Sequence, residues 1–325
     1  MDMQRMEPVG RSEVGEEKIS PVGGPGTAIR AEDLTKDYGE GESVVHALRG
    51  VDVSFDQGMF TAIMGPSGSG KSTLMHTLAG LDSVTRGHVY LNMVNATGLS
   101  EGRKKFRGQR GEVDLTTLND NQLTLLRRRN LGFIFQSFNL LPMFTARQNI
   151  ETPLTLDGGR PDREWMDLLV RTLGLEGRLD HRPSELSGGQ QQRVAIARAL
   201  ITKPSIVFAD EPTGNLDSLS SAEVLGFLRR SVRELGQTVI MVTHDPLAAS
   251  YADRALVFSD GRVVADQEKP TVEIMNDLMA KDSQTLLDPP RVPLQADGAP
   301  RVRREGDVPD DGGALRPSGP SMSER

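Results

Sequence analysis

The most informative segment of this chain is Gly65-Pro66-Ser67-Gly68-Ser69-Gly70-Lys71-Ser72-Thr73. It follows a short apolar run, Phe60–Met64, that predicts a buried strand, and it opens a segment, Lys71–Ala79, that predicts a helix. Glycines let a backbone turn tightly and aim its N–H groups at phosphate oxygens, and a helix N-terminus adds the positive end of a dipole. We therefore expect a phosphate cradle in which Lys71 reaches the β- and γ-phosphates and the Ser72 hydroxyl binds Mg²⁺.

Strand and helix patterns continue to alternate along the chain. Ser205–Ala209 and Thr238–Thr243 are apolar runs typical of buried strands, and Ser221–Leu235 carries apolar residues on one helical face. Near the end of this region, Asp260-Gly261 separates two β-prone runs, which predicts a hairpin. Together these patterns predict an α/β fold with a mostly parallel sheet.

Composition excludes several classes of function. The 325-residue chain has a formal net charge of -7, so it lacks the basic surface that nucleic acid binding requires, and we expect no nucleic acid partner. It has no cysteine, which rules out disulfides, thiolate metal sites and thiol catalysis. No run approaches the roughly 18 to 20 apolar residues of a membrane-spanning helix, and no signal-peptide core precedes the domain. These features predict a cytoplasmic protein whose membrane role depends on a partner.

The two ends of the chain differ from its middle. Residues 1–26 and 288–325 are rich in Gly, Pro and charged residues without periodicity, so they predict a disordered leader and a disordered tail. Residues 28–268 predict one α/β domain without internal repeats, and residues 269–287 predict a helical extension.

A second motif decides which class of nucleotide-binding protein this is. Leu186-Ser187-Gly188-Gly189-Gln190 precedes a predicted helix that Ser187 can cap and whose buried stripe comprises Val194, Ala197 and Ile201. The strand at Ser205–Ala209 then ends in Asp210-Glu211. A phosphate cradle, this LSGGQ sequence and a strand ending in two acids, in this order, resemble the ATP-binding cassette (ABC) ATPases.

The resemblance covers about residues 28–268, with six motifs in the family's order, and it implies roles residue by residue. Among the expected catalytic residues, Glu211 resembles the general base, His244 the switch histidine at the γ-phosphate and Gln136 the Q-loop glutamine. The full catalytic set is Glu211, His244, Gln136 and Lys71, and the implied Mg²⁺ ligands are Ser72, Gln136 and Asp210. The implied ATP-binding residues are Tyr38, as an adenine-stacking ring, the cradle residues Gly65, Pro66, Ser67, Gly68, Ser69, Gly70, Lys71, Ser72 and Thr73, then Ser187, Gly188, Gly189, Gln190 and Asp217.

The family's architecture sets further expectations. The resemblance implies an ABC ATPase core with an antiparallel β subdomain and a helical signature subdomain at about residues 137–190. It also implies a homodimer in which two chains meet head to tail, so that Ser187 and Gly189 act on the partner's nucleotide while Asp217 communicates across the interface. ATP and Mg²⁺ are the expected cofactors.

Two further stretches resemble one branch of the family. The Q-loop sequence Phe135–Pro142 and the segment Asn149–Leu154 resemble cassettes that serve lipoprotein release, macrolide export and bacterial cell division. Such cassettes work with a separate permease of the FtsX type, so the resemblance implies a subunit peripheral to the inner face of the membrane that powers export of a lipoprotein, lipid or hydrophobic compound. The alternatives are a regulatory ATPase that signals to a cell-wall hydrolase, a soluble ABC ATPase, and an importer.

Two basic segments stand apart from these motifs. Residues 93–113 replace a turn that is short in relatives, and they carry Arg103, Lys104, Lys105, Arg107 and Arg110. Such a segment is either a basic loop that contacts anionic lipid or the permease, or a solvated insertion, and the charge run favours the second interpretation. Arg127-Arg128-Arg129 closes a predicted helix, Asp120–Arg129, and is expected to be a solvated helix end.

Overall fold

The computed structural model describes residues 26–92 and 111–287. Nearly all of the expected leader, most of the insertion and the expected tail lie outside the described residues, so the expectations for them are not tested. The described residues belong to one compact unit that ends at Leu287. None of the described helices is long and apolar enough to cross a membrane.

The central sheet has six strands in the order β10-β9-β3-β8-β7-β6. The strands β9, β3, β8, β7 and β6 run parallel, and only β10 is antiparallel to its neighbour, which confirms the expected mostly parallel sheet. Their bounds are β3 Phe60–Met64, β6 Leu131–Phe135, β7 Ile206–Asp210, β8 Thr238–Thr243, β9 Arg254–Ser259 and β10 Arg262–Glu268.

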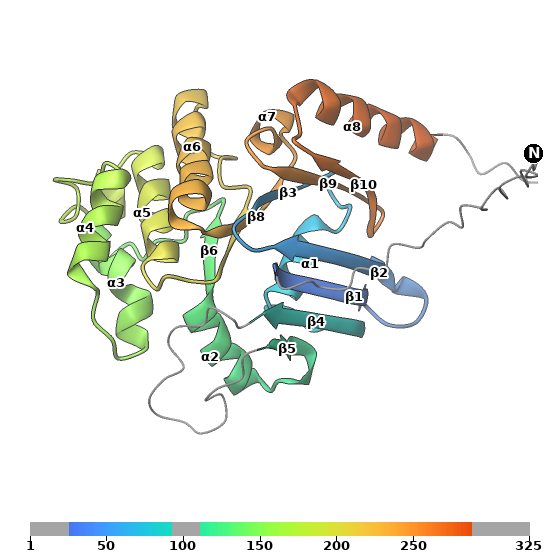
Figure 1. The fold of residues 1–325 in the computed structure, drawn as a ribbon, viewed down its shortest axis with the longest axis horizontal. Helices are drawn as coiled ribbons and strands as arrows, with labels where there is room; N and C mark the ends of the chain where they lie inside the picture. The colour runs from blue at the N-terminus through green and yellow to red at the C-terminus, as the bar shows by residue number, and fades with distance from the viewer. Residues whose placement is uncertain (1–25, 93–110, 288–325) are drawn as a thin grey trace, which may run out of the picture. The chain divides into compact units, whose positions relative to one another are not determined.

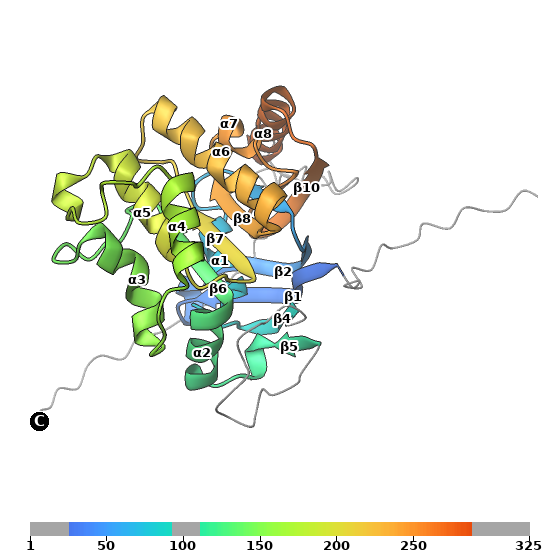
Figure 2. The same ribbon diagram turned by 60° about the vertical axis from the view of Figure 1, so that its left-hand side comes forward.

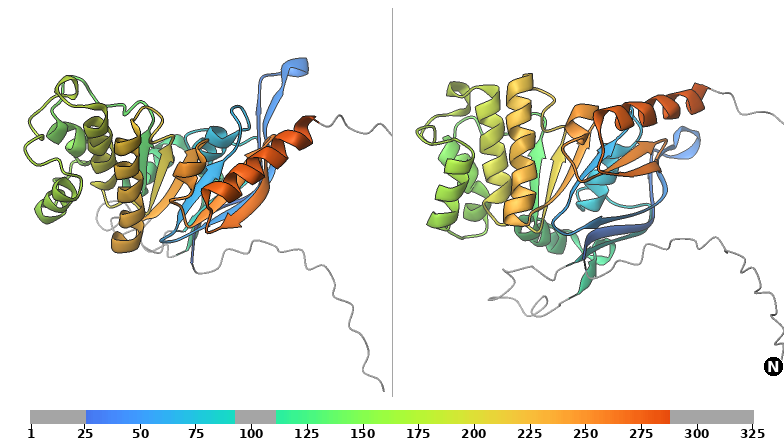
Figure 3. Two further views of the ribbon diagram at one scale, coloured as in Figure 1. Left: turned by 90° about the horizontal axis from the view of Figure 1, so that it is seen from above. Right: turned by 45° about the horizontal axis from the view of Figure 1, so that its top comes forward.

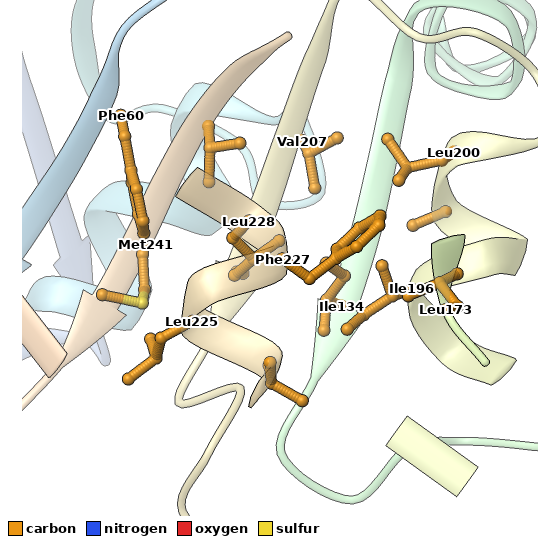
Figure 4. Close-up of a cluster of buried hydrophobic side chains, with 14 of the residues drawn as sticks. Phe60, Ile134, Leu173, Ile196, Leu200, Val207, Leu225, Phe227, Leu228 and Met241 are labelled. Atoms are coloured by element: carbon orange, nitrogen blue, oxygen red, sulfur yellow. The ribbon is translucent and has the colours of Figure 1, made fainter. Parts of the chain in front are cut away.

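Both faces of this sheet are covered at its centre, which explains why the central strands are almost entirely apolar. All residues of β3 and β8 are buried. Alternate side chains enter two different cores: Met241 packs with Phe60, Val207, Leu228 and the helices of one face, whereas Ile240 packs toward the other face. Figure 4 shows the first core, where Phe227 and Leu228 lie over the sheet and Ile196 and Leu200 face them.

An antiparallel sheet of four strands, in the order β2-β1-β4-β5, covers part of the second face. It consists of β1 Thr27–Tyr38, β2 Val45–Asp56, β4 Arg86–Asn92 and β5 Glu112–Asp114. Figures 1 and 2 show β1, β2 and β4 side by side, apart from the helices α3 to α5. This sheet is the antiparallel β subdomain that the resemblance implies.

The helices surround the central sheet in separate groups. Figure 1 shows α3, α4 and α5 gathered at one end of the described unit, past β6, while α8 lies beside α7, as Figure 3 also shows. The helices are α1 Lys71–Leu78, α2 Asp120–Asn130, α3 Ala146–Leu156, α4 Arg163–Thr172, α5 Gly188–Leu200, α6 Ser218–Leu235, α7 Pro246–Ala249 and α8 Val272–Leu287, with short 3-10 turns η1 Gly41–Ser43, η2 Leu115–Thr117 and η3 Pro183–Glu185.

Two local expectations, the hairpin near the end of the domain and the start of α6, can be compared with this arrangement. The hairpin at Asp260-Gly261 is present, and both residues have positive φ, 45° and 75°, as its tight turn requires. Helix α6 begins at Ser218 rather than Ser221, because the Asp217 carboxylate accepts hydrogen bonds from the first free N–H groups, those of Leu219 and Ser220.

The basic end of α2 is bound rather than solvated. Arg127 donates to the Gly80 carbonyl, Arg128 donates to the Leu156 carbonyl at 3.0 Å, and Arg129 forms an ion pair with Asp157 at 3.2 Å. The expectation of a solvated helix end is therefore wrong. The charge run alone could not show this, because Leu156 and Asp157 lie at the end of another helix.

Candidate functional site

The candidate site is built at the ends of four neighbouring strands. In the order β3, β8, β7, β6, each parallel strand is followed at once by a residue expected in the site: Gly65, His244, Glu211 and Gln136. The register is aligned as well, since Met64 lies opposite Thr243, and Phe135 lies opposite Asp210. Parallel sheets bind ligands outside the carboxyl ends of their strands, so this edge is where a ligand is expected.

The glycine cradle has a backbone that other residues could not adopt without strain. Gly68 and Gly70 have φ of 80° and 102°. A Cβ on Gly65 would lie 2.0 Å from the Phe258 carbonyl oxygen, and one on Gly70 would lie 2.4 Å from that of Ala47. The glycines are therefore needed for close backbone packing as well as for turning the loop.

A cleft of about 610 Å³ opens beside this loop. Its walls combine the cradle, the start of α1 and the hairpin between β1 and β2. The lining residues are Tyr38, Val44, Val45, His46, Ala47, Arg49, Gly68, Gly70, Lys71, Ser72, Thr73 and Asp260. The volume suits a nucleotide-sized ligand.

Lys71 is a buried cation that faces this cleft. Its Nζ donates to the Pro66 carbonyl at 2.7 Å, and among the described residues it forms no ion pair. Burial lowers the pKa of Lys71, although the carboxylates of Glu211 and Asp210 oppose that shift. An ammonium group in such a place gains most from an added anion, which fits a phosphate ligand.

A second polar group in the loop also points to a ligand. The buried Ser69 hydroxyl has no hydrogen-bond partner within the described protein, although its carbonyl accepts from Gly261 N–H at 2.9 Å. Buried hydroxyls are normally paired, so a bare one beside a phosphate cradle indicates a missing ligand oxygen or water.

Two of the three side chains expected to bind Mg²⁺, those of Ser72 and Asp210, lie close together. Ser72 Oγ is 3.3 Å from Asp210 Oδ1, although these residues are far apart in the sequence. Hydroxyl and carboxylate oxygens are the donors that Mg²⁺ prefers, so these residues fit the ion. The Gln136 side chain is exposed and lies against Gly214, where an added Cβ would be 2.6 Å from Gln136 Nε2.

Glu211, the expected general base, lies beside His244, the expected contact of the γ-phosphate. His244 Nδ1 lies 2.8 Å from Glu211 Oε1. Glu211 has φ of 45°, a left-handed conformation that is uncommon outside glycine and is concentrated at functional sites. Its N–H donates to the Val242 carbonyl of β8 at 2.9 Å, which holds this conformation.

Tyr38 lies in the wall of the cleft, with 41% of its surface exposed. Its hydroxyl donates to Asp82, whose other oxygen accepts from Lys36 Nζ at 2.7 Å. Lys36 Nζ also sits 4.8 Å from the centre of the Tyr38 ring. Burial and the Asp82 hydrogen bond raise the pKa of Tyr38, so the ring stays neutral and held in place.

The signature residues lie elsewhere. Ser187 is exposed and caps α5 in a reciprocal capping box with Gln190, as expected of a capped helix. A Cβ on Gly189 would lie 2.8 Å from Ser220 Oγ, so α5 packs closely on α6. The cleft has no signature residue among its walls in the described chain. Asp217 caps α6, and hydrogen bonds from Ser220 keep its pKa low.

Several polar residues around the site carry no signal in the sequence. Arg198 of α5 donates to two Q-loop carbonyls, Asn215 donates to the Gln136 carbonyl at 2.9 Å, and Gln192 donates to that of Pro212 at 2.5 Å. These contacts join segments that are far apart in the sequence, so they are visible only in the folded chain.

Comparison with known proteins agrees with this geometry. A family model described as ABC transporter matches residues 48–214, about half of the chain. The macrolide export ATP-binding/permease protein MacB of Marinobacter nauticus is 45% identical over 254 residues, which are 77% of this chain and 36% of that protein. This chain thus spans about a third of the length of the MacB relatives it matches.

Shorter relatives match along nearly their whole length. The lipoprotein-releasing system ATP-binding protein LolD of Geobacter metallireducens is 44% identical over 240 residues, 72% of this chain and 96% of that protein. A dimeric, post-hydrolysis structure of the ATP-binding cassette MJ0796 bound to ADP and Pi aligns with a TM-score of 0.63 and 37% identity, over 74% of this chain and 98% of that one. This chain therefore belongs to the ABC transporter family and carries its ATPase domain.

Proposed function

We propose that this chain is the motor subunit of an ABC transport complex: it binds Mg-ATP, hydrolyses it as a homodimer and drives a permease on a separate chain. One observation carries the proposal. Four neighbouring strand ends bring the phosphate cradle, His244, Asp210-Glu211 and Gln136 to one edge of the sheet. Phosphoryl transfer needs positioning and charge stabilisation, and these groups supply both.

Each group has a part that its surroundings support. The cradle N–H groups and Lys71 bind the phosphates, and Ser72 and Asp210 hold Mg²⁺, which when bound neutralises phosphate charge. Glu211 accepts the proton of the attacking water, and His244 holds the Glu211 carboxylate in place and contacts the γ-phosphate. Gln136 orients the water, and the Tyr38 ring stacks on the adenine.

The homodimer follows from where the signature residues lie. In the described chain the cleft is lined without Ser187–Gln190, while Ser187 is exposed at the start of α5. Helix α1, which follows the cradle, packs on β8 and β1. Helix α5, which carries the signature, packs on β6, the strand at the edge of the central sheet. A second copy, placed head to tail, would bring its signature to this cleft, and the similar cassette structure is described as dimeric.

Mixing two inactive variants tests the composite site. Lys71→Ala removes the phosphate ligand of one chain, and Ser187→Arg blocks its signature. In a mixed dimer one of the two sites combines an intact cradle with an intact signature, so we expect mixing to restore ATP hydrolysis, although each variant alone is inactive. If mixing restores nothing while each variant still dimerises with wild-type chain, ATP is not held between two copies.

A groove beside the Q-loop supports a permease as the second partner. It measures about 390 Å³, and its apolar lining comes mainly from α3 and β6. Leu81, which follows α1, and Leu156 of α3 are 45% and 65% exposed there, while α2 contributes Arg127 and Arg128. We infer that it receives a short cytoplasmic helix of the permease, with an apolar face and an acidic end. This contact would make the subunit peripheral on the inner face of the membrane.

Co-purification tests this partner. A Leu156→Asp variant, exposed at the end of α3, should keep ATP hydrolysis but lose the membrane protein that wild-type chain retains, whereas Leu235→Asp, exposed on α6, should keep it.

The names of the relatives favour export of a lipoprotein, lipid or hydrophobic compound. Retention of ribosomes in place of a membrane protein would favour a soluble ABC ATPase. If the activity of a bound cell-wall hydrolase depends on ATP turnover and no cargo is moved, the result would favour the regulatory alternative.

A further inference from the structure

Arg198, on the signature helix α5, is bound to the backbone of the loop that carries Gln136. Its guanidinium donates to the Phe138 carbonyl at 2.8 Å and to the Asn139 carbonyl at 2.6 Å. A guanidinium presents its donors in a rigid planar fork, so one side chain fixes two adjacent carbonyls at once.

The loop that Arg198 holds has an unusual backbone. Phe138 and Asn139 both have positive φ, 57° and 48°, although neither is glycine. Left-handed backbone is unfavourable for residues other than glycine and persists only where its surroundings fix it. Two left-handed residues in succession turn the chain sharply just after Gln136, and their carbonyls face Arg198.

Arg198 also differs from an ordinary surface arginine. It is half-buried and, among the described residues, forms no ion pair with a carboxylate. Burial lowers its pKa without a compensating acid. The two carbonyls are therefore the partners that offset its desolvation, and the loop and the arginine stabilise each other.

The same loop is held from a second side. Asn215, in the segment that follows Glu211, donates from Nδ2 to the Gln136 carbonyl at 2.9 Å. The Phe138 ring lies near the signature itself, since a Cβ on Gly188 would be 3.9 Å from its Cζ atom. The Q-loop is thus fixed between the signature helix and the segment that carries the candidate base.

We propose that Arg198 is a positioning residue that fixes the loop presenting Gln136 and so ties the signature helix to the chain's own catalytic centre. The inference rests on the proposed role of Gln136. When a partner's nucleotide engages Ser187–Gln190, a movement of α5 is passed through Arg198 to Gln136 of the same chain. Sites on the two copies then become coupled without contact between Arg198 and any nucleotide.

Kinetics of Arg198→Met test this positioning. We expect kcat to fall about tenfold while the Kd for a fluorescent ATP analogue changes less than about twofold, because a displaced orienting group affects the reaction more than binding. Arg198→Lys, which keeps a charge on one carbonyl, should recover part of kcat. Arg193→Met is the matched control: this arginine of α5 also donates to backbone carbonyls, those of Gly189 and Leu173, but not to the Q-loop, and it should keep the wild-type kcat.

A double-mutant cycle separates positioning from general support of the fold. In a Gln136→Ala background, Arg198→Met should lower kcat less than about twofold further, since the group it positions is already gone. Equal effects of Arg198→Met with and without Gln136, or a wild-type kcat for Arg198→Met alone, would overturn the inference and leave the proposed function intact. A wild-type kcat for Gln136→Ala would instead remove Gln136 from the proposed function, and the inference with it.

A second variant covers the case in which Arg198→Met does not fold. Asn215→Asp is nearly isosteric and exposed, and it replaces the donor to the Gln136 carbonyl with an acceptor. It should lower kcat about as much as Arg198→Met and show the same lack of further effect in the Gln136→Ala background. If the effects of Asn215→Asp and Gln136→Ala on kcat were fully additive, that result would also contradict the proposal.

Discussion

At the scale of single residues, Glu211 has a strained backbone conformation that the surrounding fold maintains. Its φ of 45° places the carboxylate 2.8 Å from His244 rather than along the strand direction. A hydrogen bond to Val242 maintains this turn at the end of β7. The strain of about 1 to 3 kcal/mol is offset by the surrounding sheet, and the resulting turn holds the carboxylate beside His244.

Glu211→Gln keeps the size of this side chain but removes its basicity. We expect the rate of ATP hydrolysis to fall about 100-fold or more, because general bases contribute on this order. ATP binding should persist, so the variant should accumulate as a dimer in ATP, as measured by light scattering after gel filtration. Glu223→Gln, on the exposed face of α6, serves as the control and should hydrolyse ATP normally. Normal turnover by Glu211→Gln would refute the general-base role.

Gly70 tests whether the cradle needs space as well as positive φ. Gly70→Ala places a methyl group 2.4 Å from the Ala47 carbonyl, so the loop must shift, and we expect ATP affinity to be lost. Gly236→Ala meets a similar conformational penalty, with φ of 66°, but has nothing within 4 Å. It should lose only about 1 to 2 kcal/mol of unfolding free energy and bind ATP as before. Unchanged affinity in Gly70→Ala would show that the cradle can relax.

At the scale of elements, a side chain of β1 holds the short edge strand β5. Arg30 stacks on Tyr90 of β4 at 4.0 Å and continues to Glu112 of β5, which it contacts through two hydrogen bonds at 2.9 and 2.8 Å. The strand pairing β4–β5 spans only three residue pairs, so this contact contributes much of what fixes the edge.

This contact makes the stability of the sheet depend on pH. The Arg30 guanidinium holds the pKa of the Glu112 carboxyl below its usual value, although burial opposes the shift. The stabilisation is therefore complete above the unfolded pKa of about 4.3 and is lost as pH falls through the lower folded value. Glu112→Gln should lower the free energy of unfolding in urea at pH 7, and the difference from wild type should persist down to about pH 4.3 and shrink below it, as pH falls through the lower folded pKa. A difference that does not shrink in acid below the folded pKa would show that the charge of Glu112 contributes nothing.

How far the sequence predicts these elements depends on the range of the interactions. The strands β3 and β8 and the hairpin turn at Asp260-Gly261 are set by local patterns, and the structure confirms them. Apolar periodicity predicts the start of α6 three residues too late, at Ser221, because the Asp217 side chain caps the helix before its first apolar position. The contacts of Arg198 and Arg128 with distant carbonyls have no local signal, since any exposed helix can carry an arginine.

At the scale of the whole molecule, ligand binding at one edge of the central sheet should stabilise the entire unit. At a free ATP concentration of 100 times Kd, the gain is about 2.7 kcal/mol, because only the folded state binds. We expect Mg-ATP to raise the melting temperature of the wild-type chain and to leave that of Lys71→Ala unchanged. Removal of Mg²⁺ with a chelator should reduce the wild-type shift. An equal shift in Lys71→Ala would mean that ATP is bound elsewhere.

The order of strands in the central sheet has a consequence for synthesis on the ribosome. The neighbours of β3 are β8 and β9, so the loop that follows β3 packs against Phe258 and Gly261, which are translated almost two hundred codons later. A nascent chain that stops before these residues leave the exit tunnel has the glycine motif but no wall to shape it. Nucleotide capture therefore begins only after β9 and the turn that follows it have been translated, and until then the apolar strand β3 needs protection from aggregation by chaperones.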